Sequence, residues 1–216
     1  MEKQMFCYQC QETAFGTGCV FKGVCGKQPA TAHLMDLLLF TLKGVGAVAS
    51  VLNDNHIEIP ETVDKVIVDG LFSTITNANF DNDSIAEKIT RALECKRQLI
   101  AMAKDNNLTV PDLEAVALEV APEDYEQKGR EVGVLKEADE NARSLKELTM
   151  YGLKGMAAYY EHAARLGDTD RNIIRFMERA LAKTADPATP GNELLDLVME
   201  TGRYGVDVMA LLDKAN

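Results

Sequence analysis

The sequence predicts an all-α fold in which a cysteine-rich N-terminal loop precedes two three-helix bundles of similar plan. Apolar residues recur every three or four positions along most of the 216-residue chain, as on one face of a helix, and no stretch alternates like a strand. Residues 36–47 (DLLLFTLKGVGA) also align without a gap with residues 147–158 (ELTMYGLKGMAA), and each copy begins a group of three helices. Both copies hold a glycine, Gly44 and Gly155, at a helix-interior position that costs about 1 kcal/mol. We therefore expect close helix–helix approach at both glycines.

The first predicted bundle occupies residues 30–105 and follows a loop over residues 1–29. Pro29 stands where a helix can begin, because the first turn of a helix does not need an N–H from that position. Apolar residues then keep helical spacing, and polar residues interrupt the pattern twice. We expect three helices, over residues 30–52, 60–76 and 83–105, with a polar turn at 77–82.

A connector over residues 106–130 separates this bundle from the second one, which occupies residues 131–216. Pro111 and Pro122 interrupt the connector, and acidic residues gather in it, so we expect only short helical pieces there. The second bundle opens with a long periodic stretch, and an Asp-Thr-Asp sequence then supplies an N-cap for its next helix. Its three helices are predicted over residues 135–166, 168–184 and 192–212.

Composition limits the classes of partner. The formal net charge of −11 disfavours nucleic acid and anionic lipid surfaces. Hydrophobic residues make up 46% of the chain, enough for a well-filled core, and no uninterrupted apolar run approaches the roughly 20 residues of a membrane span. Residues 1–5 show no apolar segment like that of a secretory signal. We expect a cytoplasmic protein that binds neither nucleic acid nor membrane.

Four of the five cysteines lie within the first 25 residues, in the spacing C-x2-C-x8-C-x5-C. Cys7, Cys10, Cys19 and Cys25 could serve disulfides, a zinc ion or an iron–sulfur cluster. Disulfides are disfavoured by the expected reducing compartment and by a chain long enough to build its own core. No nucleophile–base pair, phosphate-binding loop or carboxylate pair elsewhere predicts a catalytic residue.

Zinc is the structural alternative. A closed tetrahedral site needs four ligands, usually from two close C-x2-C pairs, and only Cys7 and Cys10 form such a pair. The spacing from Cys10 through Cys25 also resembles a C-x8-C-x5-C-x3-H finger that binds RNA, but Pro29 occupies the histidine position. A zinc-stapled helical interaction module without redox activity therefore remains the alternative function.

An iron–sulfur cluster explains more of the neighbouring residues. Cubane clusters are held by four cysteine thiolates, and the ligand loop needs glycines that let the backbone approach closely, here Gly16, Gly18, Gly23 and Gly26. The first 35 residues carry three lysines against two glutamates, which suits an anionic centre within an acidic protein. Aromatic residues that could shield a cluster from water lie in the same segment, namely Phe6, Tyr8, Phe15 and Phe21.

The loop and two distant segments resemble one known family. The loop segments are residues 5–14 (MFCYQCQETA), 16–19 (GTGC) and 23–27 (GVCGK), and the distant segments are 37–44 (LLLFTLKG) and 202–216 (GRYGVDVMALLDKAN). They resemble the N-terminal part of the hybrid cluster protein family, also called hydroxylamine reductase or prismane protein. The resemblance covers essentially all of the chain and also implies two helical bundles.

The resemblance implies a cofactor and an activity. In this family the tight cysteine spacing implies a [4Fe–4S] cluster, with Cys7, Cys10, Cys19 and Cys25 as ligands, whereas a wider spacing implies a [2Fe–2S] cluster. The domain then implied is an electron-transfer domain that receives electrons from a redox partner protein. The parent reaction is the reduction of hydroxylamine to ammonia, with nitric oxide as another candidate substrate.

The family's catalytic hybrid cluster lies in later α/β domains and needs further cysteines, but only Cys95 follows Cys25 in this chain. We therefore expect those domains to be absent and assign no reductase activity to the chain alone. Surface that they would cover could support self-association. Cys95 is expected to be a packing residue. His33 is expected to be a residue of the first helical turn rather than a replacement ligand.

Overall fold

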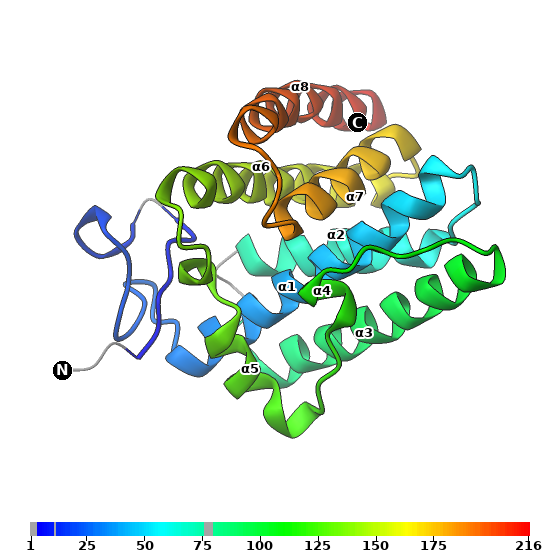
Figure 1. The fold of residues 1–216 in the computed structure, drawn as a ribbon. Helices are drawn as coiled ribbons and strands as arrows, with labels where there is room; N and C mark the ends of the chain where they lie inside the picture. The colour runs from blue at the N-terminus through cyan, green and yellow to red at the C-terminus, as the bar shows by residue number, and fades with distance from the viewer. Residues whose placement is uncertain (1–3, 11, 76–79) are drawn as a thin grey trace.

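The computed structural model describes residues 4–10, 12–75 and 80–216, and this part of the chain is helical, without strands (Figure 1). Only an isolated antiparallel bridge joins Cys7 and Cys19. The α-helices of this part are α1 Pro29–Asp54, α2 Glu61–Ile75, α3 Asn82–Asp105, α4 Glu114–Ala117, α5 Tyr125–Glu131, α6 Glu140–Arg165, α7 Arg171–Ala185 and α8 Gly191–Ala215. The predicted all-α class is confirmed. The predicted turn at 77–82 falls partly outside the described residues.

Aspartate N-caps set three of the helix starts. The side chain of Asp81 accepts from the backbone N–H groups at the start of α3, and Asp170 does the same for α7. Asp139 Oδ1 accepts from the N–H of Ala142 at 2.7 Å, so α6 begins at Glu140. The predicted start at residue 135 was therefore wrong, because a short 3-10 turn over Val134–Lys136 precedes the cap.

The connector carries two short helices, α4 and α5, as its prolines predict. Pro122 begins a 3-10 turn that leads directly into α5, and α5 extends one residue beyond the predicted end of the connector, to Glu131. Both short helices pack on α1. The connector therefore covers one side of the central helix instead of crossing solvent.

The middle helix of each group packs mainly on the first helix of the other group. α1 packs on α3 and α6 packs on α8, within each group, but α2 packs mainly on α6 and α7 packs mainly on α1. The resulting order of layers places α8 and α3 at opposite sides, with α6, α7, α1 and α2 between them (Figure 1). One buried apolar cluster includes residues of both helix groups, so the two groups share a core. The division of the chain into two bundles stays a prediction from the sequence.

Only one of the two aligned glycines lies at a close contact. A Cβ atom built on Gly44 would stand 2.2 Å from the carbonyl oxygen of Ala115 in α4, so α1 and α4 approach as closely as backbone allows. A Cβ atom on Gly155 would meet no described atom within 4 Å. The expectation of close approach is confirmed at Gly44 and was wrong at Gly155.

α1 is the only described helix that is long and apolar enough, by length and composition, to cross a membrane. Of the apolar window that meets this test, 72% is buried inside the fold, where α1 contacts α3, α4, α5 and α7. The core helix of a soluble protein meets the same test, so this helix is weak support for a membrane span.

Two buried charged side chains join helices in the core. Lys96 of α3 is fully buried and donates to the carbonyl oxygens of Ala115, at 3.2 Å, and Leu118. Glu178 of α7 is also fully buried and accepts from Asn53 Nδ2 at 2.6 Å and from Arg171 at 3.1 Å. Buried charges need such partners, because desolvation of an unpaired ion costs on the order of several kcal/mol.

Candidate functional site: the cysteine loop

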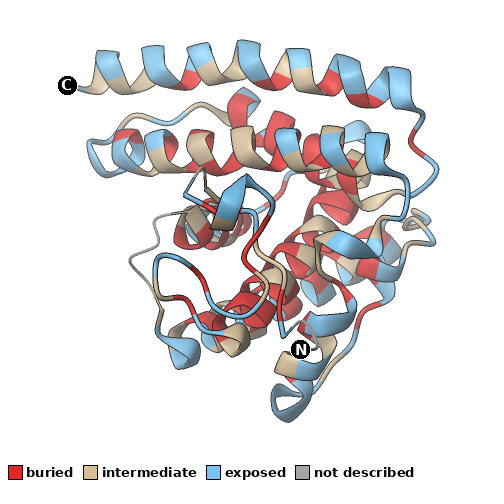
Figure 2. Cartoon of the chain, turned by 90° about the vertical axis from the view of Figure 1, so that its left-hand side faces the viewer, coloured by how far each residue is buried: buried red, intermediate tan, exposed pale blue. Residues whose placement is uncertain are grey.

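The cysteine loop lies at one end of the helical body, beside the start of α1 and against α6 (Figure 1). Figure 2 looks onto this end and shows buried and exposed segments alternating along the loop. Cys7 and Cys19 exchange two backbone hydrogen bonds, with N···O distances of 3.0 and 2.9 Å. Below them, Met5, Cys19 and Ala32 form a small apolar cluster that attaches the loop to the first turn of α1.

The four loop thiols differ in their surroundings. Cys19 is buried, Cys7 and Cys10 are half-buried, and Cys25 is exposed. Burial would raise the pKa of the Cys19 thiol, but backbone N–H donors, including Ala14 at 3.4 Å, and the Thr13 hydroxyl outweigh it and lower that pKa. Burial raises the pKa of Cys7, and Lys27 partly offsets the effect. Hydrogen bonds to sulfur are what a thiolate ligand to iron needs, since they stabilise its negative charge.

Glycines give the loop its curvature, as their positions predict. Gly16, Gly18 and Gly26 have positive φ angles of 68°, 118° and 96°. A Cβ atom on Gly18 would stand 2.6 Å from the Phe6 ring, and one on Gly23 would stand 3.0 Å from the Cys25 sulfur. Larger residues would therefore displace an aromatic neighbour at Gly18 and a proposed ligand at Gly23.

Two buried lysines lie near the ligand cysteines predicted in the loop, one from the loop itself and one from α6. Lys27 is 1% exposed and its Nζ lies 3.9 Å from Cys7 Sγ. Lys154 of α6 is 2% exposed and donates to the side-chain oxygen of Gln9, which is itself buried. Within the described part of the chain neither ammonium group forms an ion pair with a carboxylate. Burial of unpaired cations is costly, so negative charge at the cysteines would stabilise this arrangement.

These two cations are the test of whether the loop suits an iron–sulfur cluster. Four thiolates around a cubane carry net negative charge. Here Lys27 Nζ lies 3.9 Å from Cys7 Sγ, and the Ala14 N–H donates to Cys19 Sγ. Lys154 donates to Gln9, which stands between Cys7 and Cys10. The donor set therefore fits the cluster, and it would also suit a zinc tetrathiolate. Among residues 4–10, 12–75 and 80–216, no three cysteine, histidine or acidic side chains are close enough to share one metal ion.

The other sequence candidates lie away from the loop thiols. Cys95 is buried in the apolar core, and burial raises the pKa of its thiol to about 12, so it is a packing residue as predicted. His33 lies in the first turns of α1 and faces α5, with Nδ1 3.7 Å from Glu126 Oε1. Burial lowers the pKa of His33, and the neighbouring Arg130 lowers it further.

The aromatic residues of the loop are less buried than shielding requires. Phe15 is fully exposed, Tyr8 and Phe21 are 45% and 43% exposed, and Phe6 alone packs closely, on Gly18. The interpretation of Phe15 as a shield was wrong, because its backbone, at φ 53°, carries the ring outward into solvent. Together with Val24, these residues give the exposed rim of the loop an apolar surface.

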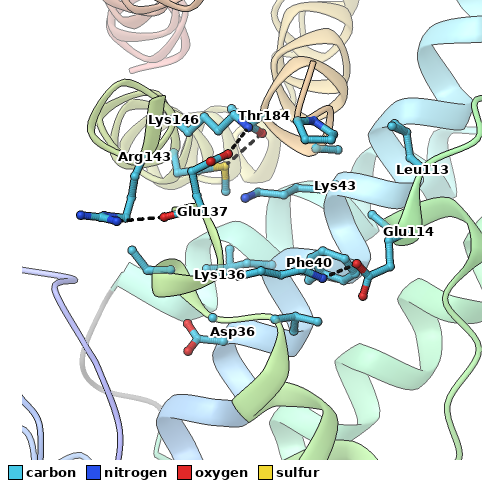
Figure 3. A pocket seen from close by; sticks show the side chains of 18 of the residues that line it. Asp36, Phe40, Lys43, Leu113, Glu114, Lys136, Glu137, Arg143, Lys146 and Thr184 are labelled. Carbon is cyan, nitrogen blue, oxygen red and sulfur yellow. Dashed lines mark hydrogen bonds and ion pairs between the residues drawn. The ribbon is translucent and has the colours of Figure 1, made fainter. Parts of the chain in front are cut away.

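A cavity of about 260 Å³ is lined by α1, α6, the end of α7 and the segments 112–115 and 132–137 (Figure 3). Lys43, Asp36 and Glu147 line it, whereas Lys146 is paired with Glu137 at 2.7 Å and Lys136 is paired with Glu114 (Figure 3). Burial and the nearby Glu147 together raise the pKa of Asp36 to about 7, although Lys154 opposes the change. Burial lowers the pKa of Lys154 to about 8, although Glu147 opposes the change.

Sequence reasoning missed this group of charges. Asp36 and Lys43 occupy the same repeat positions as Glu147 and Lys154, so the internal repeat brings four charged residues into one region. The Leu-Lys-Gly sequence common to both copies was the available signal. It could not show that Lys154 reaches the cysteine loop, because that contact joins residues 145 positions apart.

Comparison with known proteins agrees with the resemblance seen in the loop. Residues 5–216 match the family model described as "Prismane/CO dehydrogenase family". A protein named hydroxylamine reductase from Porphyromonas gingivalis is 51% identical over 217 residues, which cover 100% of this chain and 40% of that protein. Proteins of the same name from Desulfitobacterium hafniense and Bacteroides fragilis are 48% and 46% identical and match over 39% and 38% of their own lengths.

This chain therefore spans about two fifths of the length of the curated relatives that it matches. The family match begins at residue 5 and ends at residue 216, so it includes the four loop cysteines and all eight described α-helices of this chain. From the length of the match and the identities, the chain belongs to the Prismane/CO dehydrogenase family.

Proposed function

We propose that this chain is an electron-transfer domain that binds a [4Fe–4S] cluster through Cys7, Cys10, Cys19 and Cys25. A cluster of this kind takes up and releases single electrons. The observation that carries the proposal is the pair of buried ammonium groups, Lys27 and Lys154, which face the loop without carboxylate partners in the described part of the chain. Thiolates that bind a cluster would add negative charge beside these two cations.

The chain's own residues have separable tasks in this proposal. Cys19 lies within hydrogen-bond distance of the Ala14 N–H and the Thr13 hydroxyl, which favour its thiolate. Cys7 lies against Lys27, and Cys25 lies at the surface. The exposed Phe15 and Val24 surround the outer side of the loop, where an electron donor protein could dock on an apolar surface.

The wider activity is a proposal for the longer protein in which such a domain occurs. The relatives are named hydroxylamine reductases, and we propose that this domain delivers electrons for a reaction of that class when the remaining part of such a protein accompanies it. A cytoplasmic location and self-association through exposed apolar residues of α8, such as Met199 and Val206, belong to the same proposal.

Metal analysis of matched cysteine variants tests the cluster. The chain is isolated without oxygen, or reconstituted with iron and sulfide, and its iron, acid-labile sulfide and zinc are measured together with the visible absorption spectrum. We expect about four irons and four sulfides per chain in the natural protein. Cys19→Ala should lose both, whereas Cys95→Ala, which alters a buried thiol in the helical core, should keep both.

Two results would contradict the proposal. One is a colourless natural protein with a single tightly bound zinc and no sulfide, which would favour the zinc-stapled interaction module. The other is equal iron and sulfide in the Cys19→Ala variant and the natural protein. Far-UV circular dichroism of both variants checks that the helical body is intact, so that loss of metal is not a consequence of unfolding.

A further inference from the structure

Lys154 is a buried cation that reaches the cysteine loop from the far half of the chain. It belongs to α6, is 2% exposed, and donates to the side-chain oxygen of Gln9. Gln9 is 7% exposed and stands between Cys7 and Cys10, so this hydrogen bond attaches the ligand pair to α6. Tyr151, one turn earlier on the same helix, also lies near both thiols.

Lys154 has nearby carboxylates but no direct carboxylate partner. In the described part of the chain it forms no ion pair, although Glu147 and Asp36 lie near enough to influence it. Burial lowers its pKa to about 8, which leaves the ammonium form predominant at pH 7. Lys27, the other nearby cation, lies two residues from Cys25. A substitution at Lys27 would therefore change ligand geometry and charge together, whereas Lys154 allows the two to be separated.

A fixed positive charge near a redox centre favours the more negative oxidation state. Reduction by one electron adds one negative charge to the cluster, and an ammonium group in a low-dielectric interior stabilises that charge more strongly than it would in water. Groups beyond the direct ligands commonly adjust a metal centre in this way.

We propose that Lys154 is a positioning residue that holds the Cys7–Cys10 segment through Gln9 and raises the reduction potential of the bound cluster. This inference rests on the proposed [4Fe–4S] site and assigns to α6 a role in its redox chemistry. The partner reaction is an ordinary one-electron exchange, in which the donor loses the electron that the cluster gains.

Potentiometric titration of the cluster-loaded chain tests this role. Lys154→Met keeps the length of the side chain and removes its charge, and we expect one-electron reduction to become at least tenfold less favourable, a potential about 59 mV more negative. Lys154→Arg keeps the positive charge. Its equilibrium constant for one-electron reduction should therefore lie within threefold of that of the natural protein. Lys146→Met is the matched control, because Lys146 is a buried lysine two turns earlier on α6 that pairs with Glu137.

Iron and sulfide content is measured for each variant, so that only fully loaded protein enters the comparison. A fully loaded Lys154→Met variant with the natural potential would overturn the inference. If that variant takes up no cluster, Lys154→Gln decides, since it removes the charge and keeps a side chain that can hydrogen-bond to Gln9. It should lower the potential, and an unchanged potential would overturn the inference. Failure of the natural protein to bind iron and sulfide would instead contradict the proposed function.

Discussion

Alanine substitution at the two aligned glycines should change the free energy of unfolding in opposite directions. Gly44 and Gly155 occupy the same place in the internal repeat, yet Gly44 contacts the backbone of α4 and Gly155 contacts no described atom within 4 Å of a built Cβ. Substitution by alanine removes the helix-propensity cost of about 1 kcal/mol at both. Only at Gly44 does the new methyl group meet backbone atoms.

The structure gives the size of the difference. In Gly44→Ala the Cβ atom would stand 2.2 Å from the Ala115 oxygen, so α4 must move by about 1 Å to restore ordinary contact. Lys96 resists that movement, because it donates to the same oxygen at 3.2 Å. Overpacking typically costs about 1–3 kcal/mol, so we expect a net loss of about 1–2 kcal/mol in the free energy of unfolding. Gly155→Ala should gain up to about 1 kcal/mol.

Urea unfolding followed by far-UV circular dichroism measures both variants under reducing conditions. Unchanged slopes against urea concentration would show that the two variants expose the same surface on unfolding. The expected separation in melting temperature is roughly 5–10 °C for a chain of this size. Equal stability of the two variants, or a more stable Gly44→Ala, would refute the packing argument and with it the close approach of α1 and α4.

Two further predictions concern buried charges. Asn53→Ala removes a donor to the fully buried Glu178 and should cost about 1.5–3 kcal/mol of unfolding free energy. Asn55→Ala should cost much less, because the Asn55 side chain donates to an exposed carbonyl at the end of α1. Equal costs of the two variants in urea titrations would contradict this prediction. Asp36 has a pKa raised from 3.8 to about 7, so its contribution to stability is present below pH 3.8 and is lost as pH rises through 7. Asp36→Asn should therefore flatten the decline in unfolding free energy between about pH 4 and 7 in the cluster-free chain. A profile that stays as steep as that of the natural protein would show that another group is responsible.

Much of the fold could be predicted because local signals agree with the final structure. The aspartates at positions 81, 139 and 170 cap the helices that follow them, and the apolar spacing marks the buried faces. The exception is the start of α6. Periodicity continues across Val134–Lys136, but the cap at Asp139 sets the start of the α-helix and leaves those residues in a 3-10 turn.

The candidate site was predicted only in part. Residue spacing predicts Cys7, Cys10, Cys19 and Cys25 as ligands, which stays a prediction, and glycine positions anticipated the curvature of their loop. Neither the burial of Lys27 and Lys154 nor the exposure of Phe15 could be predicted, because they depend on how the loop docks on α1 and α6. The exchange of middle helices was equally beyond local signals, since the repeat shows which segments are equivalent and does not show which of them touch.

That exchange has a consequence during synthesis. α1 ends at Asp54, but its main partner from the second half, α7, is complete only at Ala185, roughly 130 residues later. At ribosomal speeds of about 5–20 residues per second, the apolar surface of α1 that α7 will cover waits on the order of ten seconds. A nascent chain of this kind would need chaperone protection for that interval, and cellular yield should depend on it more than on the equilibrium stability of the finished protein.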